Sequence, residues 1–161
     1  MSIDSFLKIE GVEGESRDVK HQKWIDILSW SWGMTQSGYA HVGGGMGAGK
    51  VDVQDISLVK YVDKASPTIM LKCAQGKHFP KVELVVRKAG GDEPLEYFKL
   101  QMDDVIVTSY STGGSGGEDR LTESISFNFA KVKSTYAVQT KAGVKESENE
   151  FTWNIAENRS E

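Results

Sequence analysis

The sequence predicts a mainly β protein, an antiparallel barrel or sandwich of short strands with one α-helix and one long glycine-rich loop. Short runs in which apolar and polar residues alternate recur along most of the chain, and this period of two is that of a strand with one buried face. Glycine-containing turns separate the runs, as expected for antiparallel neighbours. Only the segment Ser66–Gln75 spaces its apolar residues as a helix does.

The first half of the chain contains three strand segments. Residues 3–9 place isoleucine and leucine on one face of a first short strand. The segment from Trp24 to Trp32 is apolar on both faces, so we expect this second strand to be covered on both sides. From Val51 to Leu58 the alternation changes phase, which predicts a β-bulge near Gln54–Asp55.

The predicted helix, Ser66–Gln75, has both a start signal and an end signal. Ser66 is a favoured N-cap residue, and Pro67 suits the first helical turn. Gly76 is a favoured residue for the end of a helix, because glycine adopts the left-handed conformation without strain. The residues at helical spacing that we expect to pack on the barrel are Ile69, Met70 and Cys73.

Alternation returns after the helix and continues almost to the end of the chain. Turns at Gly90–Asp92, Gly113–Gly117 and Gly143 separate these later strands, and the polar segment 141–150 is expected to be a solvated loop or hairpin. The alternating apolar positions are Val82, Leu84 and Val86, then Phe98, Leu100 and Met102, then Val105 and Val107, then Ile125, Phe127 and Phe129, then Val132, Tyr136 and Val138, and finally Phe151, Trp153 and Ile155.

Length and composition limit the partners that the chain can have. Its 161 residues suit a single domain over residues 1–161, and with a net charge of -4 and no long lysine or arginine cluster we expect no nucleic-acid partner. The one cysteine, Cys73, cannot form an intramolecular disulfide, which suits folding in the cytoplasm. We expect no membrane insertion, because no apolar run is long enough to span a bilayer. Met1–Glu15 does not resemble a signal peptide, so export would use a route that the sequence does not display.

The glycine run from Gly43 to Lys50 partly matches a phosphate-binding loop. Gly44–Lys50 fits the start of that motif, but Val51 stands where serine or threonine would hold magnesium. The motif also needs a helix after it, whereas a strand is predicted here. We therefore expect no nucleotide site. The loop from Gly33 to Lys50 is nevertheless long for a compact domain, which favours a functional role.

The remaining polar segments do not predict catalysis. The segment from Ser111 to Arg120 resembles an anion-binding nest, but Glu118 and Asp119 would repel an anion, and a wide turn between strands is the preferred interpretation. We expect no catalytic residue, no cofactor site, no metal site and no enzymatic activity. No second ligand at zinc-site spacing accompanies any of the three histidines, His21, His41 and His78.

Several blocks of the chain, in order and at compatible spacing from Asp4 to Ile155, resemble the Hcp (haemolysin co-regulated protein) family of type VI secretion systems. Met46 departs from the more uniform glycine run of that family. The blocks are Trp30–Met34, the glycine run to Lys50, Val51–Asp55, Lys60–Pro67, Gly76–Pro80, Arg87–Gly91, Ser111–Glu123 and Trp153–Ile155.

The resemblance implies a structural role. Hcp proteins are β-barrels with one helix that form hexameric rings, and the rings stack into a tube inside a contractile sheath with a VgrG spike at its tip. Contraction expels the tube, so the protein would fold in the cytoplasm and be secreted without a cleaved signal peptide. The lumen of the ring would hold and protect small effector proteins. The alternative is a monomeric ligand-binding β-barrel, although the four tryptophans lie at alternating strand positions, which favours core packing.

Loop length together with this resemblance gives two hypotheses about sites. We expect the turn around Ser111, Thr112 and Ser115 to face the lumen, because it offers small side chains and exposed backbone. We expect the glycine-rich loop, within Gly38–Val53, to make the contact between stacked rings, through Gly38, Tyr39, Gly43, Gly44, Gly45, Met46, Gly47, Gly49 and Lys50.

Overall fold

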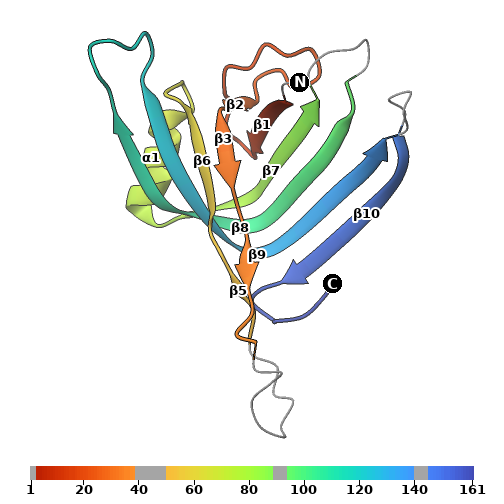
Figure 1. Ribbon diagram of the computed structural model, residues 1–161. Helices are drawn as coiled ribbons and strands as arrows, with labels where there is room; N and C mark the ends of the chain where they lie inside the picture. The colour runs from red at the N-terminus through yellow and green to blue at the C-terminus, as the bar shows by residue number, and fades with distance from the viewer. Residues whose placement is uncertain (1–2, 39–49, 89–93, 140–144) are drawn as a thin grey trace, which may run out of the picture.

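A computed structural model describes residues 3–38, 50–88, 94–139 and 145–161 of the chain (Figure 1). The elements follow one another in the order β1 (Ile3–Ile9), β2 (Ile25–Ile27), β3 (Ser29–Ser31), β4 (Met34–Thr35), β5 (Asp52–Val53), β6 (Ile56–Tyr61), α1 (Ser66–Gln75), β7 (His78–Lys88), β8 (Glu96–Gly113), β9 (Thr122–Gln139) and β10 (Lys145–Asn154).

Eight of these strands form one antiparallel sheet in the order β2-β1-β7-β8-β9-β6-β3, with β10 added to β9. The two ends of this path are consecutive in sequence, since only Leu28 separates β2 from β3. The Leu28 amide donates to the Val59 carbonyl of β6 at 2.8 Å. The sheet therefore curves into a nearly closed barrel (Figure 1), and the predicted fold class is confirmed. The remaining strands, β4 and β5, pair with each other as a separate two-stranded arm.

The core lies on the inner face of this barrel and is formed by every second residue of the strands, as the alternation of apolar and polar residues predicts. The long strand β8 keeps its apolar side chains inward across a change of phase, because Asp104 adopts φ 52° between Met102 and Val105. Aspartate tolerates this left-handed conformation better than most residues. The predicted apolar positions that the barrel buries are Val82, Leu84, Val86, Leu100, Met102, Val105, Val107, Ile125, Phe127, Phe129 and Val132.

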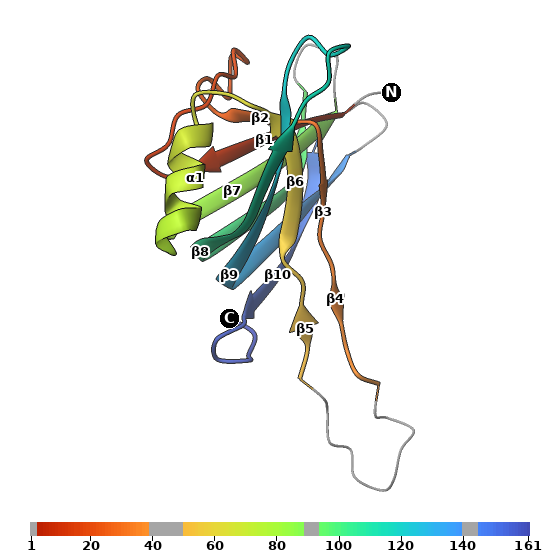
Figure 2. The ribbon, with the colours of Figure 1, turned by 90° about the vertical axis from the view of Figure 1, so that its left-hand side faces the viewer.

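The helix α1 has the predicted bounds and lies beside β8 on one side of the barrel (Figure 2). Gly76 ends it with φ 65°, and the Gly76 amide donates to the Cys73 carbonyl at 3.3 Å. Two expectations are wrong. The N-cap is Ala65 rather than Ser66, because the Ser66 hydroxyl points into a buried polar cluster instead. Met70 is 41% exposed, so the packing face of the helix is narrower than expected and is centred on Ile69.

The second predicted strand, from Trp24 to Trp32, is divided and is not covered on both sides. It splits into β2 and β3 at Leu28, which is 50% exposed, as the chain passes from one edge of the sheet to the other. Ile25 and Ile27 are buried, whereas the tryptophans of this segment are only partly buried.

The phase change near Gln54–Asp55 marks a change of partner rather than a bulge within one strand. β5 pairs with β4 before this point, and β6 pairs with β9 and β3 after it. The polar segment that begins at Lys145 forms β10, which completes a hairpin with β9. Within the described ranges, no helix combines the length and hydropathy needed to cross a membrane.

Candidate functional site

The inner face of the sheet passes from a buried core to an open apolar surface. Residues directly opposite each other on antiparallel strands point to the same side, so the register aligns them in rows from β7 to β10. One row is Val82, Met102, Val132 and Trp153, the next is Leu84, Leu100, Ser134 and Phe151, and the third is Val86, Phe98, Tyr136 and Asn149.

We call β10 together with Lys131–Gln139 of β9 the wing, and the last two residues of each row lie on its inner face. The first row is still buried there, with Val132 0% exposed. Trp30 of β3 stacks on Phe98 with ring centroids 5.6 Å apart, which covers the third row at β8. Beyond that point Tyr136 is 47% exposed and Phe151 is 38% exposed. In the described part of the chain, β10 pairs with β9 alone, so the other edge of β10 is unpaired. An unpaired edge beside exposed aromatic side chains is suited to contact with another chain.

The arm formed by β4 and β5 extends away from the barrel (Figure 2). Trp32 fixes its base, because the indole Nε1 donates to the Gln54 carbonyl at 3.0 Å and the ring lies 6.4 Å from that of Phe129. Of the predicted stacking residues, Gly38, with φ 70°, and Lys50 are described, and both are exposed. Residues Tyr39, Gly43, Gly44, Gly45, Met46, Gly47 and Gly49 lie outside the described residues.

The predicted lumen-facing residues lie at the other end of the barrel from the arm, at the connection between β8 and β9 (Figures 1 and 2). Ser111 and Thr112 lie near the C-terminal end of β8, and Ser115 lies in the connection. All three residues are exposed. The Thr112 hydroxyl donates to the Thr122 carbonyl at 2.8 Å, and Arg120 stacks over the Tyr61 ring at 3.8 Å. The arm and the connection between β8 and β9 thus lie at opposite ends of the barrel (Figures 1 and 2).

A buried charged cluster that was not predicted from the sequence lies beneath this connection. Lys60 is 0% exposed and its ammonium donates to Glu123 and, at 2.9 Å, to Asp63. The Ser66 hydroxyl donates to the same Glu123 carboxylate. Burial, together with this carboxylate, raises the pKa of Tyr110 to about 12, so the Tyr110 phenol stays neutral. A signal was present, because Lys60 continues the inward positions of β6.

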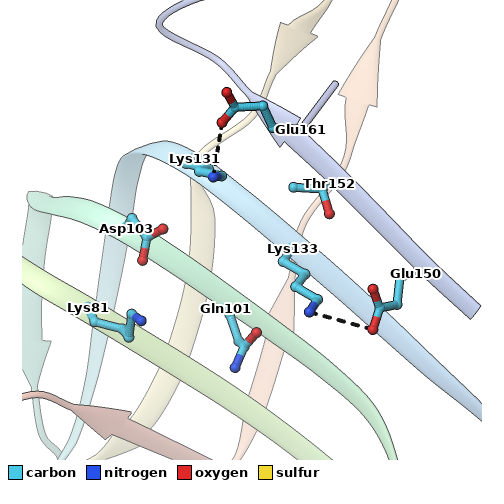
Figure 3. Close-up of a pocket in the computed structure, with 8 residues that line it drawn as sticks. All are labelled: Lys81, Gln101, Asp103, Lys131, Lys133, Glu150, Thr152 and Glu161. Carbon is cyan, nitrogen blue, oxygen red and sulfur yellow. Dashed lines mark hydrogen bonds and ion pairs between the residues drawn. The ribbon is translucent and has the colours of Figure 1, made fainter. Parts of the chain in front are cut away.

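The outer face of strands β7 to β10 is polar and contains a shallow concavity of about 420 Å³ (Figure 3). The Lys131 ammonium lies 3.1 Å from Glu161, and the Lys133 ammonium lies 3.5 Å from Glu150. Within each pair the two opposite charges neutralise each other, so the concavity has no concentrated charge of one sign. The described residues hold no group of three or more histidine, cysteine or acidic side chains that could bind a metal ion.

Comparison with known proteins agrees with this architecture. Residues 6–136 match the family model described as "Type VI secretion system effector, Hcp". The chain is 52% identical to Protein hcp1 of Pseudomonas aeruginosa over 159 residues, which cover 98% of each protein. The solved structure of Hcp1 from Salmonella typhimurium is 38% identical, with a TM-score of 0.82 over 99% of each chain. A structure described as a type six secretion system protein is 29% identical, with a TM-score of 0.92 over 99% of this chain and 100% of that one.

Proposed function

This chain belongs to the Hcp family of type VI secretion proteins, and on that premise we propose that it is a structural subunit of a secreted tube. In this proposal six copies form a ring, rings stack inside a contractile sheath, and contraction expels the tube behind a VgrG-type spike. The protein folds in the cytoplasm and leaves the cell without a cleaved signal peptide. It has no catalytic role of its own.

The open inner face of the wing is the observation that supports a ring most directly. A strand with an unpaired edge and exposed Tyr136 and Phe151 exposes apolar surface that a single copy leaves in water. A second copy seated on the wing would cover it. We propose that a different surface of the second copy, not its own wing, makes this contact. Such a contact is head-to-tail, and head-to-tail contacts close into a ring when the rotation between neighbours allows it.

We assign different roles to the two ends of the barrel, ring stacking to one and the lumen to the other. The arm extends from one end, and we assign the ring-to-ring contact to Gly38–Val53, which includes β5 of the arm. Ordering a long glycine-rich segment costs conformational entropy, which keeps that contact weak enough for the tube to come apart after delivery. We assign the lumen to the turn around Ser111, Thr112 and Ser115, where small effector proteins would be held.

The solution mass of the purified protein tests the ring. We expect light scattering after size exclusion to give about six times 17.7 kDa, with ring-shaped particles in electron micrographs. A monomer at high protein concentration would overturn the proposal and would favour the alternative, a monomeric ligand-binding barrel.

A loop deletion tests the stacking contact separately. Removing Gly43–Gly47 should leave the hexamer intact and reduce the number and length of stacked tubes. Tubes that form as readily as those of the parent protein would show that stacking uses another surface.

A further inference from the structure

The loop between β1 and β2, residues 10–24, is fastened to the barrel by a buried histidine. His21 is 1% exposed and lies between two carboxylates: its Nδ1 is 2.8 Å from Asp18 Oδ2 and its Nε2 is 2.6 Å from Glu96 Oε1. Its ring stacks on Phe6 with centroids 4.4 Å apart, and the Trp24 ring packs edge-on at 4.8 Å. Asp18 belongs to the loop and Glu96 begins β8, so His21 joins the two.

The number of protons in this arrangement is fixed by its geometry. A neutral imidazole has one N–H donor and one acceptor nitrogen, whereas an ionised carboxylate only accepts. If both carboxylates are ionised, both hydrogen bonds exist only when His21 is protonated on both nitrogens. With one proton fewer, one of the two nitrogens faces a carboxylate lone pair, and that contact is repulsive.

Asp18 is held in its ionised form. Burial disfavours the charge, but hydrogen bonds from Arg87 and His21 outweigh burial and lower the pKa of Asp18 to about 2. The Arg87 guanidinium contacts both Asp18 oxygens and stacks over Phe6 at 4.9 Å. The contact with Glu96 is therefore the one that depends on the second proton of His21.

Charged groups on every neighbouring strand surround this site. Glu96 uses both of its oxygens: Oε1 faces His21, and Oε2 lies 3.2 Å from the Lys99 ammonium. The charged side chains that contact His21 or its neighbours are Asp18 of the loop, Asp4 and Lys8 of β1, Asp26 of β2, Arg87 of β7, and Glu96 and Lys99 of β8.

We propose that His21 is a proton-operated clasp that holds the 10–24 loop against the start of β8. The clasp is closed while the His21 imidazole carries two protons. As the pH rises and one proton leaves, the contact with Glu96 is lost and the loop loosens. The clasp acts within a single copy, so it does not depend on the proposed assembly.

Amide hydrogen exchange of the full-length protein tests the clasp. The amides of Gly14, Ser16, Lys23 and Trp24 are hydrogen-bonded within the loop, so they report its opening. As the pH is raised and the second proton leaves, their protection should fall about tenfold after correction for intrinsic rates. The amides of β7 and β9 should not change. Loop protection that is independent of pH would overturn the proposal.

Two variants and one spectroscopic measurement separate the clasp from a merely structural contact. Glu96→Gln offers an amide that can donate to a neutral ring, so the loop should stay protected and the pH dependence should vanish. His78→Gln alters an exposed histidine and should behave as the parent does. The nitrogen-15 shifts of His21 should show two protonated nitrogens at about pH 5. A ring with a single proton at that pH, or an unchanged pH dependence in Glu96→Gln, would contradict the clasp.

Discussion

A fully buried lysine is costly to keep unless its charge is matched. Lys60 is matched by Glu123 and Asp63, and the substitution Lys60→Met would leave the Glu123 carboxylate buried without its cation. We expect the free energy of unfolding to fall by about 3–5 kcal/mol, measured by urea denaturation. Adding Glu123→Gln should restore part of the loss, because a neutral amide is less costly to bury. Lys64→Met is the control, since Lys64 is 53% exposed, and a loss as large there would contradict this account.

Asp18 makes the stability of the fold sensitive to acid. Its pKa is lowered from 3.8 to about 2, with burial opposed by hydrogen bonds from Arg87 and His21. A lowered pKa in the folded state adds stability that is present above the unfolded value and is lost as the pH falls through the folded value. Because Asp18 is only 18% exposed, we expect Asp18→Asn to cost about 1–2 kcal/mol at neutral pH and about a fifth as much near pH 2. Urea unfolding at both pH values measures this, and an equal cost at both would contradict it.

Among the elements, the helix depends on its end signal. Gly76 has φ 65° and no atom lies within 4 Å of an added Cβ, so Gly76→Ala introduces backbone strain without a clash. We expect a loss of about 1 kcal/mol in the free energy of unfolding. Gly116→Ala is the matched control, because its Cβ would also meet open space and its φ is not positive. A similar cost at both positions would show that the left-handed conformation is not the cause.

Local sequence patterns predicted the elements better than the contacts between them. Pro67 and Gly76 predicted both ends of α1, and alternation predicted the inward residues of β7, β8 and β9. The division of β2 from β3 was missed, although the adjacent apolar pair Ile27 and Leu28 marks the change of phase. Which strand covers each face is decided by pairing, and no local pattern contains that information.

The polar clusters were missed for a related reason. Lys60 and Glu123 are 63 residues apart in sequence, and His21 and Glu96 are 75 apart. No spacing rule connects residues so distant, and only the register of the sheet brings them together. The glycine-rich loop and the turn around Ser115 could be singled out because each is a continuous segment of the sequence. Their assignment to stacking and lumen comes from the family and stays a prediction.

For the whole molecule, the proposed ring predicts different effects of substitutions on the two faces of the wing. The sheet buries apolar side chains on its inner face and presents charged ones outside, so adjacent residues of β10 face opposite environments. Phe151 points to the inner side, in a row with Leu84 and Leu100, while the next residue, Thr152, lines the outer polar concavity (Figure 3). If a neighbouring copy covers the inner face, only the first of these two positions is buried by assembly.

The paired substitutions Phe151→Asp and Thr152→Asp therefore distinguish the faces. A carboxylate at position 151 would have to be desolvated in the proposed interface, so we expect light scattering to show a shift from the hexamer to the monomer. Phe151 is 38% exposed in a single copy, which means that the monomer itself should keep its fold, as judged by circular dichroism. Thr152→Asp should remain hexameric. A hexamer that survives Phe151→Asp but not Thr152→Asp would place the subunit contact on the outer face, and the open aromatic surface of the wing would then need another partner.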